Sequence, residues 1–235
     1  MKKNSLIFAL GLVALTLSSC DDGDIQEKVY STNNNGRVIK LTGKINGIKN
    51  WSSNYSVALA GFGESNYSIV QKNITASDNG DVELTLSVTS NEIKTIELCV
   101  TNILRERILT FKSMDVPEGN DSILFNVGEQ NVGMFHVIQQ EIFNSTCLQC
   151  HGGSNTAAAG LYLTEEKSHE ALVRKPSTKV EGGTLVIPGD SKNSVLHRVL
   201  NKGGETGLKF NHEDMINTDK KLQIIDDWID HGANE

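Results

Sequence analysis

The sequence predicts two domains in series, an N-terminal antiparallel β-sandwich followed by an all-α C-terminal domain, and three patterns support this prediction. Apolar and polar residues alternate over 37–128, helical periodicity begins at about residue 129, and turn-forming residues separate the segments. Alternation is typical of half-buried strands, and a period near 3.6 is typical of amphipathic helices. A chain of 235 residues is long enough for two such domains.

The overall composition is that of an ordinary globular protein with an excess of acidic residues. Hydrophobic residues make up 38% of the chain and charged residues 22%, which fits neither a disordered nor a fibrous protein. The formal net charge is -7, and it becomes more negative if the N-terminal lysines are removed. Because nucleic-acid binding relies on positive charge, we expect no nucleic-acid partner.

The N-terminus has the order of features of a secretory signal peptide. Lys2 and Lys3 precede an apolar run over 6–17, and small residues follow it. This run is too short to span a bilayer comfortably. The stretch Leu17-Ser18-Ser19-Cys20 resembles the bacterial lipobox, which implies a lipoprotein signal peptide over 1–19 and a lipid attached to Cys20.

Residues 20–36 predict a flexible tether between this lipid and the folded part of the chain. The segment is acidic and then asparagine-rich, and it has no hydrophobic periodicity. Acyl chains on Cys20 would hold the protein at a membrane while the rest stays in water. We therefore expect a protein of the bacterial cell envelope, anchored on the periplasmic or surface side, with the outer membrane favoured.

Residues 37–128 predict a β-sandwich of the immunoglobulin or transthyretin type. Apolar residues at 82, 84, 86 and 88 alternate with polar ones, and turn signals such as Asp78-Asn79-Gly80 recur between segments of this kind. The spacing suggests roughly seven short antiparallel strands. The same pattern puts Cys99 on the polar face of its strand, as a bystander without a partner thiol in the domain. No chemistry is indicated here, so we expect a spacer or docking module whose ligand, if it has one, is unknown.

Residues 129–235 predict helices joined by long loops. Phe135, Ile138 and Ile142 recur at helical spacing in a segment that continues into a pair of cysteines. A second helix is predicted at 194–200, and a last one runs from the N-cap Thr218 to about Gly232; its apolar stripe consists of Leu222, Ile225, Trp228 and Ile229. Long glycine-containing loops are unusual in a helical domain of this size, and a large cofactor in the core would explain them.

The segment Cys147-Leu148-Gln149-Cys150-His151 is the C-x-x-C-H signature of covalent haem attachment. Two cysteines separated by two residues can reach two vinyl groups on one haem edge, and the following histidine can place its ring nitrogen on the iron. A zinc site would need further ligands of comparable spacing, and the chain has no second cysteine pair. A thioredoxin-type redox pair would need βαβ elements, which the flanking sequence does not predict.

Residues from about 135 to 235 resemble the mono-haem c-type cytochrome domains, especially the type common in planctomycete and Bacteroidota secreted proteins. The resemblance implies a cytochrome c-like all-α fold, one covalently bound haem c, and first and last helices that cross with contact between Phe143 and Trp228. The segments that carry it are 142–153 around the cysteine pair, Gly160-Leu161-Tyr162-Leu163, Pro188-Gly189-Asp190 with Ser194 and Leu196, and Asp227-Trp228-Ile229-Asp230-His231-Gly232-Ala233.

The sixth iron ligand is left open among three residues. Met215 lies just before the final helix, where the resemblance places a methionine ligand, although the family's methionine is commonly followed by proline and Ile216 follows here. His212 and His197 are the alternatives. The resemblance also implies that Pro188 lies on the proximal side and orients His151 through a carbonyl group, unless it forms only a simple Pro-Gly turn.

The function that these features predict is one-electron transfer by a membrane-anchored c-type cytochrome, with no substrate transformed. Its partners would be redox proteins, and the acidic surface would steer a basic partner towards it. Two alternatives remain at this point. One is a haem-containing subunit or domain of an oxidoreductase with an open or exchangeable sixth iron ligand. The other is a surface binding protein in which the haem domain is accessory.

Overall fold

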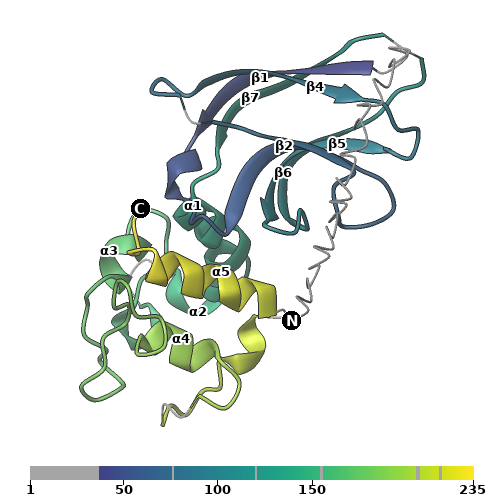
Figure 1. Ribbon diagram of the computed structural model, residues 1–235. Coiled ribbons are helices and arrows are strands. Elements are labelled where there is room, and N and C mark those ends of the chain that lie inside the picture. Colours follow the sequence, from purple (N-terminus) through teal and green to yellow (C-terminus); the bar gives the residue numbers. More distant parts are fainter. Residues whose placement is uncertain (1–36, 76, 120, 154–155, 205–206, 217–218) are drawn as a thin grey trace, which may run out of the picture. The chain divides into compact units, whose positions relative to one another are not determined.

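A computed structural model describes residues 37–235, except 76, 120, 154–155, 205–206 and 217–218 (Figure 1). The predicted signal peptide, the lipid site at Cys20, the tether and the N-cap Thr218 lie outside the described residues. No helix in the part that is described is long and apolar enough to cross a bilayer.

Seven strands form two sheets in the N-terminal part of the described chain, as the turn spacing predicted. One sheet has the order β4-β1-β7, and the other has the order β3-β2-β5-β6. The strands are β1 Arg37–Asn46, β2 Tyr55–Phe62, β3 Val70–Asn73, β4 Asp81–Val88, β5 Thr95–Asn102, β6 Arg107–Asp115 and β7 Ile123–Asn131.

The pairing of β1 departs from the predicted antiparallel arrangement. It is antiparallel to β4, with Leu41 opposite Leu84, but parallel to β7, with Leu41 opposite Phe125. Parallel neighbours need a long crossover connection, and strands β2 to β6 together supply it here. The sandwich is therefore mixed, and the purely antiparallel prediction is wrong for this reason.

Burial alternates along β1 and along the end of β4, as the period-two pattern predicted, but not along β5. Strand β5 is buried at every position from Ile96 to Thr101, and Cys99 is 0% exposed. The outer face of this sheet is covered by long polar side chains, among them Arg107, which lies over the Phe62 ring with 4.1 Å between its guanidinium carbon and the ring centroid. Cys99 shares its face of the strand with Glu97 and Thr101, as predicted, but this polar face is buried, because alternation in sequence reports side-chain type and not what covers a face.

The C-terminal part begins where β7 ends and contains short helices. They are α1 Met134–Ile138, the π-helix η2 Gln139–Cys147, α2 Leu148–His151, α3 Ser168–Leu172, α4 Val195–Leu200 and α5 Asp219–Asp230. Single 3-10 turns occur at η1 Ile48–Asn50 in the sandwich, and at η3 Ala158–Gly160 and η4 Glu213–Met215 between the helices. The helices predicted before the cysteine pair, at 194–200 and after residue 218 are confirmed.

The prediction of an all-α cytochrome c-like domain is wrong. Sheet dominates the described chain, helices make up only 26% of the structure, and α1 to α4 have four to six residues each. The long connection between α3 and α4 forms two isolated bridges, Val173 with Val186 and Pro176 with Thr184. Short helices are costly to nucleate, and α3 cannot continue past Leu172 because Val173 is extended and Arg174 has a φ of 58°.

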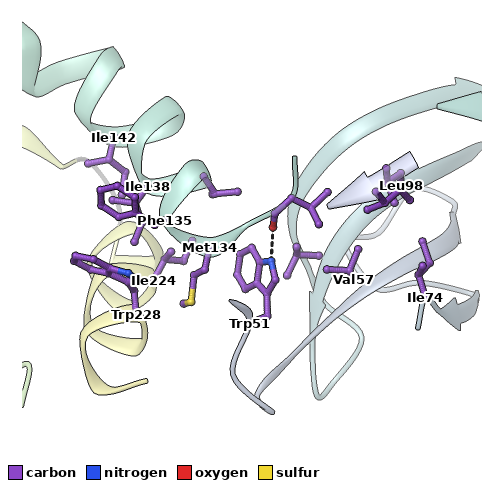
Figure 2. Close-up of a cluster of buried hydrophobic side chains, with 14 of the residues drawn as sticks. Trp51, Val57, Ile74, Leu98, Met134, Phe135, Ile138, Ile142, Ile224 and Trp228 are labelled. Atoms are coloured by element: carbon purple, nitrogen blue, oxygen red, sulfur yellow. Dashed lines mark hydrogen bonds between the residues drawn. The ribbon is translucent and has the colours of Figure 1, made fainter. Parts of the chain in front are cut away.

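Helix α5 packs its apolar face on α1 (Figure 2). The Trp228 ring stacks on Phe135, with 5.0 Å between the ring centroids, and Phe135 in turn meets Phe143 edge to face at 6.3 Å. Phe143 and Trp228 were expected to contact each other, and Phe135 contacts both of them instead. Ile225, Trp228 and Ile229 are buried, so the predicted stripe is the packing face of α5.

Hydrogen bonds also join the sandwich to the helical part. The Trp51 indole donates to the Val132 carbonyl (Figure 2), and the Tyr55 hydroxyl donates to the Asp227 carboxylate of α5. Burial, followed by the hydrogen bond to Asp227, raises the pKa of Tyr55 well above its ordinary value. Tyr55 therefore stays neutral in the folded protein at pH values at which an unfolded tyrosine ionises.

We expect Tyr55→Phe to lower the free energy of unfolding by about 1–2 kcal/mol at pH 7, because it removes a hydrogen bond to a charged acceptor. The difference between the two proteins should shrink above roughly pH 10, where the unfolded tyrosine loses its proton and the folded one keeps it. Denaturant unfolding between pH 7 and 11 measures both effects. Tyr67→Phe is the control, since Tyr67 is 50% exposed; equal pH profiles for the two variants would contradict the prediction.

Candidate functional site

The C-x-x-C-H segment lies at the junction of two helices. Cys147 ends the π-helix η2, and Leu148 to His151 form the single turn α2. Residues three apart lie on the same side of a helix, so Cys147 and Cys150 project from neighbouring positions. Gly152 follows directly, and a Cβ atom there would lie 2.6 Å from the Leu148 carbonyl oxygen. The turn can therefore close tightly behind His151 only with glycine at this position.

A cavity of about 580 Å³ opens beside this turn. Its size lies within the roughly 300–1,000 Å³ typical of ligand and cofactor sites. Cys147, His151 and His212 face into it, and most of the remaining wall is apolar, with Leu161, Leu163, Leu172, Leu196, Val199 and Leu200 among the lining residues. The long loops that the sequence predicted around a cofactor form much of this wall.

The ring of His151 is held by a loop on the cavity wall. Its Nδ1 atom lies 3.1 Å from the Leu161 carbonyl oxygen, and the amide of Leu163 donates to the His151 carbonyl at 2.9 Å. A carbonyl oxygen can only accept, so Nδ1 must carry the proton of the neutral ring. Nε2 then has a free lone pair, which is the state of a histidine that binds a metal.

The two thiols of the motif differ in their surroundings. Cys147 is half-buried and lines the cavity, whereas Cys150 is exposed, and neither forms a disulfide. Burial, followed by the charge of Cys150, raises the pKa of the Cys147 thiol to about 11. A dithiol redox centre works through a thiolate stabilised near neutral pH. Cys147 does not have that property.

Three residues were predicted as candidates for the sixth position, and the structure separates them. His212 lines the cavity, with its ring centroid 6.5 Å from that of His151 and the ring planes 28° apart. Met215 ends the turn η4 and packs on the hydrophobic core instead of lining the cavity. His197 also lies outside the lining and bonds through Nδ1 to the Asp226 carboxylate at 2.7 Å.

His212 carries the same kind of hydrogen bond as His151. Its Nδ1 atom lies 3.1 Å from the Phe210 carbonyl oxygen, which again leaves Nε2 without a proton in the neutral ring. Burial lowers the pKa of His212 below its ordinary value. A lowered pKa favours the neutral ring, which is the form that binds a metal.

Pro188 is not among the residues that line the cavity. It precedes Gly189, whose amide donates to the Ile229 carbonyl of α5 at 2.8 Å. The carbonyl group that the structure places on His151 belongs to Leu161, in a segment that the sequence singled out for its resemblance alone. No local pattern reveals which carbonyl of that segment turns towards the histidine.

Gln139 is a buried polar side chain that forms hydrogen bonds to the segments around the site. No role was predicted for it from the sequence. It is 1% exposed, and its amide nitrogen donates to the Leu163 carbonyl at 2.9 Å and to Asn144 at 2.7 Å. The hydroxyl of Ser168 donates to its amide oxygen at 2.6 Å. Gln139 thus connects the π-helix, the loop that holds His151, and α3. Only its position within an otherwise apolar helix face could have drawn attention to it.

Cationic side chains occur in the cavity wall as well. Lys167, Lys175 and Lys179 all belong to its lining. Lys175 lies 3.8 Å from Glu170, and both side chains reach into solvent. The Glu170 side chain belongs to the same lining, so the cavity is mainly apolar and has both ammonium and carboxylate groups at its border.

Neither a protein-family model, nor a curated protein, nor a solved structure matches this chain.

Proposed function

We propose that this protein is a lipid-anchored electron carrier that binds one haem covalently through Cys147 and Cys150, with His151 as an axial ligand. The observation that carries the proposal is the placement of the motif. Cys147 and the His151 ring both face an apolar cavity of about 580 Å³, and the hydrogen bond from His151 to Leu161 leaves Nε2 free. A donor set with this spacing is the signature of haem c attachment.

The residues of this chain would act mainly by binding and orienting. The sulfur of each thiol would form a carbon–sulfur bond with one vinyl group while its hydrogen passes to the other vinyl carbon, so no electron is gained or lost. The Leu161 carbonyl would keep the lone pair of His151 directed into the cavity, and Gln139 holds the same loop through the Leu163 carbonyl. When bound, the haem supplies a one-electron couple.

The surroundings of the site favour electron transfer. A haem packed against the apolar part of the wall would be shielded from water there, which lowers the reorganisation that each change of charge requires. A lipid on Cys20 would keep the protein at the membrane, within reach of redox partners, and its acidic charge would steer basic partners towards it. Covalent attachment suits this location, since haem lost outside the membrane barrier would not be recovered.

A spectrum of the full-length chain tests the proposal. We would co-express the chain with a c-type cytochrome maturation system, stain it for haem after denaturing electrophoresis, and record its pyridine haemochrome. We expect one haem per chain that survives denaturation, with the haemochrome of two thioether links. The same chain made without the maturation system is the control. A fully processed chain that carries no haem would refute the proposal.

A further inference from the structure

We propose that His212 is the second axial ligand of the iron, so that two imidazoles, from His151 and His212, hold it between them. This inference rests on the proposed function and adds the coordination of the site to it. It replaces Met215, the residue that the resemblance favours, with a histidine that lines the same cavity as His151.

The distance between the two rings fits a shared metal ion. Two imidazoles that bind one ion from opposite sides, with metal–nitrogen distances of about 2.0–2.1 Å, have their ring centres roughly 6–6.5 Å apart. The centroids of His151 and His212 are 6.5 Å apart, and both rings line the same cavity. The separation of the two ring centroids, with the ring planes 28° apart, therefore matches that of two imidazoles on one ion.

Both histidines are prepared in the same tautomer. Each has Nδ1 at 3.1 Å from a backbone carbonyl oxygen, that of Leu161 for His151 and that of Phe210 for His212. Each therefore keeps the lone pair on Nε2, the atom farther from the backbone. A hydrogen bond on the second nitrogen is the usual support of a metal-bound histidine, and both histidines of this cavity lining have one.

The position of Met215 also favours His212 as the ligand. Its side chain packs on the hydrophobic core and is absent from the cavity lining, while its amide donates to the His212 carbonyl at 2.9 Å. Met215 therefore closes the turn that presents His212. The rings of Phe210 and His212 also meet edge to face, with 4.9 Å between their centroids.

Four full-length proteins, each matured with haem, test the inference: the wild type, His212→Gly, Met215→Leu and the control His197→Ala. We expect a low-spin ferric spectrum without a sulfur-to-iron charge-transfer band for the wild type and for the Met215→Leu and His197→Ala variants. The His212→Gly variant should become high-spin, and added imidazole should restore the low-spin spectrum because it fits the space that the side chain leaves.

Haem staining after denaturation distinguishes a failure of the ligand assignment from a failure of the proposed function. Two results would overturn the assignment of His212 and leave the proposed function intact. One is a wild type that stains for haem and shows a sulfur-to-iron band. The other is a low-spin spectrum that is lost in the Met215→Leu variant and kept in the His212→Gly variant. A high-spin wild type would overturn the assignment too and would indicate an open sixth position. Unstained wild type would overturn the proposed function, and the ligand assignment with it.

Discussion

Replacing both Cys147 and Cys150 with alanine is expected to abolish all haem that survives denaturation, the largest functional effect that we predict. The reason is covalent: both thioether links come from these two sulfurs, and an axial bond from His151 does not persist when the protein unfolds. Haem staining after denaturing electrophoresis measures the loss directly. Total chain, detected with an antibody against an added tag, corrects for differences in expression.

The single variants and a third thiol make this experiment specific. Cys147→Ala and Cys150→Ala should each retain one thioether, which moves the pyridine haemochrome to longer wavelength and leaves a weaker stain. Cys99→Ala should stain like the wild type, because Cys99 is buried in the sandwich beside Ala60 and Phe62 and does not line the cavity. Full staining of the double variant would show that haem is attached elsewhere.

Trp228→Ala is expected to destabilise the chain by about 3–5 kcal/mol, the largest effect on stability that we predict. Trp228 is 2% exposed, it stacks on Phe135, and its indole nitrogen donates to the Asn234 carbonyl at 2.7 Å. Truncation removes the aromatic surface between α1 and α5 and leaves that carbonyl without its donor. The free energy of unfolding from denaturant titration of the full chain, followed by far-ultraviolet circular dichroism, measures the loss.

Two further substitutions divide the contribution of Trp228 and control for non-specific effects. Trp228→Phe keeps an aromatic ring against Phe135 but loses the hydrogen bond, so we expect a smaller loss, on the order of 1–2 kcal/mol. Leu124→Ala removes a side chain that is 62% exposed and should change stability by less than about 0.5 kcal/mol. A loss in Trp228→Ala no larger than that of Leu124→Ala would contradict the packing described for α5.

The His212 assignment shows how far local patterns carry the prediction of a site. The sequence marked Cys147, Cys150 and His151 through their spacing, and it ranked Met215 above His212 through resemblance alone. Residues 151 and 212 are far apart in the chain, and no periodicity relates them. Their approach to within 6.5 Å depends on how the loop before α5 folds over the cavity.

The sequence by itself determined the elements with local signals: the seven strands, the helices at 195–200 and 219–230, and the C-x-x-C-H motif. Hydrophobic period and turn residues act over a few positions, so they can be recognised without a fold. Only the tertiary structure decided that β1 and β7 are parallel, that Cys99 is covered, that the C-terminal part is largely loop, and that Leu161 and His212 face the site. These features depend on contacts between residues distant in the chain, where backbone closure and the packing of whole elements outweigh local preference.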